Sequence, residues 1–264
     1  MSPLEAALLG VVQGLTEFLP VSSSGHLVIV ETLLGQLGEG VLFEISVHVG
    51  TLVAILVFYR RRIVELGLGL IQREREAWVH SAKLALATLP AAAVGLGAKG
   101  FVETLFTEPR VTGLALLATG LLLLTTRRSL PRAHAPAPGF AQALWIGCAQ
   151  ALAITPGISR SGATVATALL LGVAPLAATE FSFLMAVAAI AGAALLALPD
   201  AAVADAGLLA ACGVGATTAA LSGLGALWLF VRLLERRRFQ VFAYYCLAAG
   251  AAFLLYLGWI RSGG

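Results

Sequence analysis

Two short polar segments stand out in a chain that is otherwise rich in apolar residues. The first, LTEFLPVSSSGHLV, covers residues 15–28, and the second, TPGISRSGAT, covers residues 155–164. Together they offer a carboxylate, a histidine, an arginine and several hydroxyl groups, which acid–base chemistry, nucleophilic attack and anion binding require. Ionisable side chains are costly in a membrane unless they face protein or a wet cavity, so the two segments predict a functional site.

The first segment has the chemistry of an acid, a base or a cation site. Gln13 and Glu17 are four residues apart, so they share one face of a helix that Pro20 ends. Carboxylate and amide oxygens beside free helix carbonyls suit a hard cation such as Mg²⁺ or Ca²⁺. The alternative is that Glu17 accepts hydrogen bonds from the loop as a structural anchor. His26, which titrates near neutral pH, follows in the first turn of the next helix.

Both segments also predict anion binding. Each places serines and a glycine just before a new helix, whose free N–H groups and positive dipole end attract anions. Arg160 adds a planar fork that suits phosphate oxygens. Plain helix capping remains the alternative for at least one serine of each triplet. The residues expected to bind a phosphate are Ser22, Ser24, Gly25, Ser159, Arg160, Ser161, Gly162 and Thr164.

Segments 10–35 and 147–172 are identical at 10 of 26 positions without a gap, which predicts an internal repeat. We expect repeat one to cover 1–130 and repeat two to cover 137–264, within a single membrane domain. The halves differ where chemistry is expected, since Ile154, Arg160 and Ala163 stand opposite Glu17, Ser23 and His26. One half thus offers a nucleophile or base and the other an anion clamp, as phosphoryl transfer requires. The sequence leaves open whether His26 or Ser23 attacks.

The elements that must position these groups are membrane helices. The chain is 59% hydrophobic and only 12% charged, with a mean hydropathy of +0.93, whereas soluble domains carry about 25% charged residues. The predicted fold is therefore an all-α integral membrane protein with six spanning helices plus two re-entrant helix-loop-helix pairs. The expected spans are 41–59, 82–98, 111–126, 178–198, 207–231 and 240–260. The expected re-entrant helices are 4–19, 26–38, 140–155 and 163–174.

The charges predict the orientation of these helices. Three spans follow each re-entrant pair, and because three is odd the second half starts on the opposite side, as an inverted-topology repeat. Twelve arginines fall in the loops 60–80, 127–139 and 232–239, against three basic residues on the other side. The arginine-rich loops are therefore expected in the cytoplasm and both termini outside it. A net charge of only +3 gives no reason to expect a nucleic-acid partner.

At these residues the chain resembles the undecaprenyl-diphosphatase family, the bacitracin-resistance family of membrane phosphatases. The likeness rests on QGLTEFLPVSSSGH at 13–26 and PGISRSGAT at 156–164, and it covers the whole chain in length and order. At the position of Gln13 the family has either Glu or Gln. Because this chain has Gln there, the position carries no charge. The family's site residues fall on Glu17, Ser23, His26, Ser159, Arg160 and Thr164.

The resemblance implies removal of the terminal phosphate of undecaprenyl diphosphate in the bacterial inner membrane. This reaction recycles the lipid carrier of peptidoglycan synthesis, and a high level of the enzyme confers bacitracin resistance. It also implies a divalent cation, with Glu17 and Gln13 as candidate ligands. The expected partners are the polyprenyl diphosphate, membrane lipids and, as a homodimer, a second copy of the chain.

Two other functional classes remain as alternatives. Inverted repeats with broken helices are also typical of transporters, so a lipid-carrier flippase or a small-solute transporter is the main rival. A purely structural membrane subunit is the other, and it leaves three ionisable side chains in the membrane unexplained. They are Glu17, His26 and Arg160.

Overall fold

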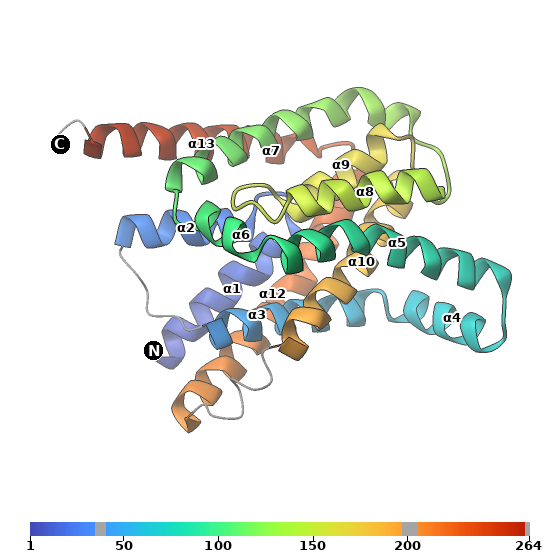
Figure 1. The fold of residues 1–264 in the computed structure, drawn as a ribbon, viewed down its shortest axis with the longest axis horizontal. Helices are drawn as coiled ribbons and strands as arrows, with labels where there is room; N and C mark the ends of the chain where they lie inside the picture. The colour runs from blue at the N-terminus through green and yellow to red at the C-terminus, as the bar shows by residue number, and fades with distance from the viewer. Residues whose placement is uncertain (35–40, 197–204, 262–264) are drawn as a thin grey trace.

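The computed structural model describes residues 1–34, 41–196 and 205–261, and these ranges are almost entirely helical (Figure 1). Within them, β structure is limited to one isolated bridge between Ala135 and Val173. The prediction of an all-α fold is confirmed.

The long helices of the described ranges match the predicted spans. They are α3 (Val41–Phe58), α5 (Arg75–Gly97), α7 (Pro109–Ser129), α10 (Pro175–Leu196), α12 (Ala206–Glu235) and α13 (Gln240–Arg261). In the described part of the chain, five helices are long and apolar enough to cross a membrane. A sixth crossing is counted when α3 and α4 (Arg60–Ile71), which meet at a bend of 75°, are taken as one span. The chain is therefore a multi-pass membrane protein.

Shorter helices form the two predicted helix-loop-helix pairs, namely α1 (Pro3–Phe18) with α2 (Ser23–Leu34) and α8 (Phe140–Leu152) with α9 (Arg160–Leu170). α1 starts at a capping box between Ser2 and Glu5, and it ends two residues before Pro20. α9 starts at Ser159, whose side chain caps the helix. The return of each pair to its starting side of the membrane stays a prediction.

The segment 60–80, which the sequence predicts as a loop, is mostly helical. It consists of α4 and the first turns of α5, and an additional short helix, α6 (Lys99–Phe106), precedes α7. In α4, the half-buried Ile63, Leu66 and Leu70 follow one another at intervals of three and four residues, so the segment forms an amphipathic helix rather than a coil. α4 folds back on α5, where a side chain at Gly69 would lie 2.7 Å from Cβ of Ala77.

Small residues allow the helices to pack closely, as is common in membranes. Gly10 and Gly14 of α1 lie so close to α12 that an added Cβ would collide with its backbone, and Gly147 of α8 lies just as close to α5. α1 thus packs on α12, α8 on α5, and α7 lies beside α13 (Figure 1). In each of these pairs, a helix of the first predicted repeat packs on a helix of the second. Two related halves would produce such a reciprocal arrangement. The repeat boundaries and the inverted orientation stay predictions.

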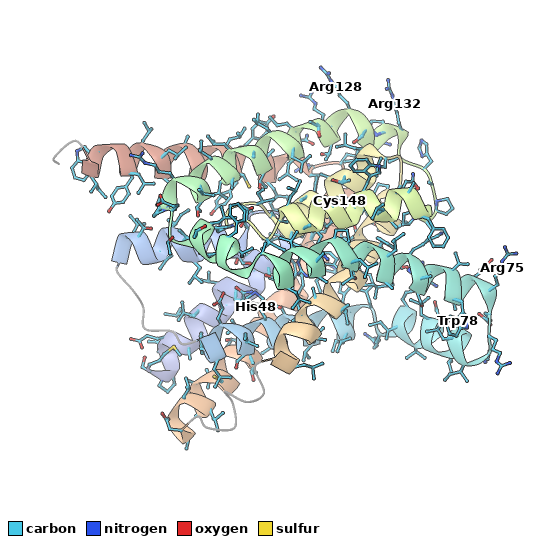
Figure 2. All side chains as sticks on the ribbon, viewed as in Figure 1. His48, Arg75, Trp78, Arg128, Arg132 and Cys148 are labelled. Atoms are coloured by element: carbon cyan, nitrogen blue, oxygen red, sulfur yellow. The ribbon has the colours of Figure 1, made fainter. Side chains whose placement is uncertain are left out.

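Three arginines of the predicted cytoplasmic connections lie away from the start of α1 and the end of α13 (Figure 2). They are Arg75, Arg128 and Arg132. The side of the membrane on which these arginines lie stays a prediction.

Candidate active site

The two polar loops meet at Ser22. Ser22 has a φ of 69°, which is unusual for a residue other than glycine, and its backbone therefore turns sharply between α1 and α2. Its Oγ accepts hydrogen bonds from the N–H of Gly25 at 3.2 Å and of Gly157 at 3.1 Å. A Cβ at Gly25 would lie 2.9 Å from Cα of Gly157, so only glycine permits this approach. The first loop is thereby fixed to the second.

The second loop is held by α7. The hydroxyl of Thr119 donates to the carbonyl of Gly157 at 2.9 Å and accepts from the N–H of Ser159 at 3.2 Å. Ser159 Oγ in turn accepts from the N–H of Gly162 at 3.1 Å, which starts α9. Arg160 follows directly, so the start of α9 fixes its side chain beside the first loop.

Glu17 is the centre of the site. Arg160 Nη2 donates to its Oε1 at 2.6 Å, and Ser23 Oγ and Gln13 Nε2 donate to its Oε2 at 2.8 and 3.1 Å. The Glu17 side chain is only 7% exposed, so its charge requires this compensation. The hydrogen bond between Ser23 and Glu17 joins a hydroxyl to a carboxylate, which is the arrangement of a nucleophile and its base.

Two residues of α3 complete the site, and sequence reasoning did not assign either to it. His48 Nε2 lies 3.8 Å from Glu17 Oε2, and Glu44, one turn earlier, lines the same cavity. Figure 2 marks His48 on α3. A signal was present in the sequence: Glu44 and Ser46 align with Glu180 and Ser182 when LFEISV at 42–47 is shifted by one residue against TEFSFL at 179–184.

These groups surround a cavity of about 390 Å³. Its polar lining comprises Thr16, Glu17, Ser22, Ser23, Ser24, Glu44, His48, Ser159 and Arg160. A smaller hollow of about 80 Å³ shares several of these residues and is also lined by Gln13, His26 and apolar side chains of α1, α2 and α3. The apolar residues are Leu9, Val12, Leu27, Val30, Phe43 and Val47. Polar and apolar side chains line both spaces, and this combination suits a ligand with a charged head and a hydrocarbon tail.

His26 lines the smaller hollow and is not among the residues that line the Arg160 cavity. Its Nδ1 lies 2.7 Å from the carbonyl oxygen of Ser22, and its Nε2 lies 2.5 Å from the hydroxyl of Tyr245 on α13. The structure therefore does not bring His26 and Arg160 together in one cavity. Of the two candidate nucleophiles, only Ser23 contacts Glu17.

The other predicted phosphate-binding residues divide into two groups. Ser22, Ser24 and Ser159 line the cavity. By contrast, Gly25, Ser161, Gly162 and Thr164 are outside its lining and are occupied with contacts inside the protein. For example, Ser161 Oγ donates to the carbonyl of Leu19 at 3.4 Å, and Thr164 Oγ1 donates to the carbonyl of Arg160 at 2.7 Å. Their positions fit loop assembly better than direct phosphate contact.

The side chains do not form a metal site by themselves. In the described ranges, no three His, Cys, Asp or Glu side chains are grouped so that they could hold a metal ion. Both oxygens of Glu17 already accept hydrogen bonds, and Gln13 directs its NH₂ group at Glu17. The predicted ligand pair therefore does not fit a cation held by the protein alone.

Comparison with known proteins identifies one family. The family model described as "Bacitracin resistance protein BacA" matches residues 6–252. A protein of Desulfosudis oleivorans is 40% identical over 270 residues, covering 96% of this chain and 98% of its own length. A protein of Syntrophotalea carbinolica is 42% identical over 260 residues, covering 96% and 98%. A protein of Rubrobacter xylanophilus is 41% identical over 268 residues with the same coverage, and all three carry the name undecaprenyl-diphosphatase.

Proposed function

The chain belongs to the bacitracin resistance protein BacA family, and from this premise we propose that it hydrolyses undecaprenyl diphosphate to undecaprenyl phosphate and inorganic phosphate. The observation that carries the proposal is the contact of Ser23 with Glu17, which Arg160 joins at the wall of one cavity. The apolar side chains that line part of the smaller hollow suit the start of a polyprenyl chain. The product returns to cell-wall synthesis as a lipid carrier.

In the proposed reaction Ser23 Oγ attacks the terminal phosphorus. An O–P bond forms while the bond from that phosphorus to the bridging oxygen breaks, and undecaprenyl phosphate leaves with the electron pair. The hydroxyl proton passes to Glu17 and from there to the leaving phosphate. Water then attacks the phosphoserine, which releases inorganic phosphate and restores the serine hydroxyl.

Arg160 stabilises the negative charge of the transferred group. Its guanidinium has five N–H donors, and within the described residues the structure records one hydrogen bond for them, to Glu17. The remaining donors are free to bind phosphoryl oxygens as charge develops in the transition state. The first turn of α9 adds its positive dipole end.

We propose that activity also depends on a divalent cation, Mg²⁺ or Ca²⁺. Because the protein side chains do not supply enough ligands, the diphosphate oxygens of the substrate would complete the coordination, as is usual for Mg²⁺. The carboxylate of Glu44, which lines the cavity, is the protein group that would be available to such an ion.

We further propose that the protein resides in the bacterial inner membrane with both termini on the extracytoplasmic side. The twelve arginines of the loops 60–80, 127–139 and 232–239 support this orientation. Homodimer formation and the absence of nucleic-acid binding also stay predictions. A flippase or transporter is not favoured, because the relatives carry the name of a phosphatase.

The test is phosphate release from undecaprenyl diphosphate by the protein purified in detergent. Wild-type protein should release one inorganic phosphate per substrate and leave undecaprenyl phosphate. A Ser23→Ala protein with the same melting temperature should be inactive, because it lacks the attacking oxygen. Folded wild-type protein that releases no phosphate, with or without a divalent cation, would contradict the proposed function.

A further inference from the structure

His26 has both ring nitrogens engaged within the protein. Nδ1 lies 2.7 Å from the carbonyl oxygen of Ser22, and a carbonyl can only accept, so Nδ1 carries the proton. Nε2 is then the acceptor for the hydroxyl of Tyr245, which lies 2.5 Å away. The two rings are nearly parallel, with an angle of 7° and a centroid distance of 5.6 Å. In this geometry neither nitrogen is free to contact a phosphoryl group.

His26 contacts Ser22, where the backbone turns sharply between α1 and α2. The carbonyl of Ser22 accepts from Nδ1 and also from the backbone N–H of His26 at 3.1 Å. These bonds stabilise the left-handed φ of 69° at Ser22. The backbone conformation at Ser22 sets the direction in which the chain continues. The next residue is Ser23, which contacts Glu17. The position of the nucleophile therefore depends on the turn that His26 holds.

α13 contacts the first loop at two consecutive residues. Tyr245 donates to His26, and Cys246 Sγ donates to the carbonyl of Pro20 at 3.3 Å. Tyr245 is 47% exposed, and a hydroxyl on a membrane helix needs a hydrogen-bond partner, which His26 supplies. α13 also packs along α7, which holds the second loop through Thr119. The helix pair α7–α13 thus supports both loops.

We infer that Tyr245 is a positioning residue of the phosphatase site, and that it acts through His26 on Ser22 and so on the Ser23 hydroxyl. The inference rests on the proposed function, because it assigns the attack to Ser23. It gives His26 the role of holding the turn rather than attacking phosphorus. Tyr245 lies more than 200 residues from the first loop in the sequence, so no local motif contains this contact.

The first test is Tyr245→Phe, which keeps the ring and removes the hydroxyl. We expect kcat to fall about three- to tenfold, the range of one neutral hydrogen bond, with KM little changed because the cavity lining is intact. Tyr244→Phe is the matched control. Tyr244 is the neighbouring residue on α13, it is 57% exposed, and its hydroxyl has no recorded hydrogen bond in the described ranges. This control should turn over at the wild-type rate.

The second test separates holding the turn from direct chemistry. The amide nitrogen of Asn occupies nearly the place of Nδ1, so His26→Asn can still donate to Ser22 but cannot contact Tyr245. We expect His26→Asn to retain at least tenfold more activity than His26→Ala. Adding Tyr245→Phe to His26→Asn should cause no further loss, because the shared hydrogen bond is already absent.

A readout independent of activity is the ¹⁵N NMR spectrum of histidine-labelled protein. The wild-type spectrum should show His26 protonated at Nδ1 and hydrogen-bonded at Nε2, with the Nε2 signal shifting in Tyr245→Phe but not in Tyr244→Phe. Folded His26→Asn that is as inactive as His26→Ala, or an unshifted Nε2 signal, would overturn the inference. Wild-type protein without phosphate release would instead overturn the proposed function, and the NMR result would still stand.

Discussion

Replacing Arg160 by lysine is the sharpest test of the phosphate clamp. Lysine keeps a positive charge near Glu17, which is 7% exposed and would otherwise be left uncompensated, so the fold should survive. A lysine ammonium cannot reproduce the planar fork of the guanidinium, which contacts Glu17 at 2.6 Å and directs its remaining donors toward phosphoryl oxygens. Losing one preorganised donor at a developing charge costs about 2.7–4 kcal/mol, which corresponds to a loss of about 10²–10³ in kcat. Single-turnover phosphate release measures this loss directly.

The chain supplies a matched control for this change. Arg62 also pairs with a glutamate, since its Nε donates to Glu180 at 2.9 Å, but it does not line the cavity. Arg62→Lys should therefore keep wild-type turnover. Melting temperatures of the two variants separate folding from chemistry. If Arg160→Lys is folded and turns over near the wild-type rate, the clamp role of the guanidinium is refuted.

Three further results are expected. Acid quenching of turnover with labelled diphosphate should trap an acid-stable phosphoenzyme that Ser23→Ala lacks, whereas an acid-labile, base-stable adduct would assign the attack to a histidine. EDTA should abolish phosphate release and Mg²⁺ or Ca²⁺ should restore it, and full activity after complete removal of bound metal would show that the reaction needs no cation. Gln13→Glu should be tolerated with the cation present, because the ion offsets the charge that a second carboxylate adds beside Glu17. A cysteine at Arg132 should be labelled only from the cytoplasm and one at Thr107 only from outside, and labelling of both from one face would contradict the inverted topology.

The long helices were predictable from the sequence because each is encoded by a local apolar run. The predicted span 240–260 and the observed α13, Gln240–Arg261, differ by a single residue at the end. The loop predicted at 60–80 was wrong because its high arginine content concealed apolar residues at helical spacing, namely Ile63, Leu66 and Leu70. A charge count identifies the side of a membrane, whereas the spacing of apolar residues determines whether a connection is helical.

The site was predictable only in part. Both loops carry local motifs, so Glu17, Ser23 and Arg160 could be identified before their contacts were known. His48 and Tyr245 belong to α3 and α13, and each looks like an ordinary residue of an apolar helix until the fold brings it to the first loop. The orientation of His26 depends on Tyr245, so the sequence could not decide between two nucleophiles.

The difference between the two halves follows from the cost of burying charge. A carboxylate at the depth of Glu17 requires a cation, and Arg160 supplies it from the other half. Ile154, which stands opposite Glu17 in the predicted repeat, lines the same cavity. A second glutamate at that position would face no second arginine, because the counterpart of Arg160 is Ser23. The Glu17 carboxylate, the Ser23 hydroxyl and the Arg160 guanidinium can therefore meet at one place only. A chain with two similar loops thus has a single reaction centre.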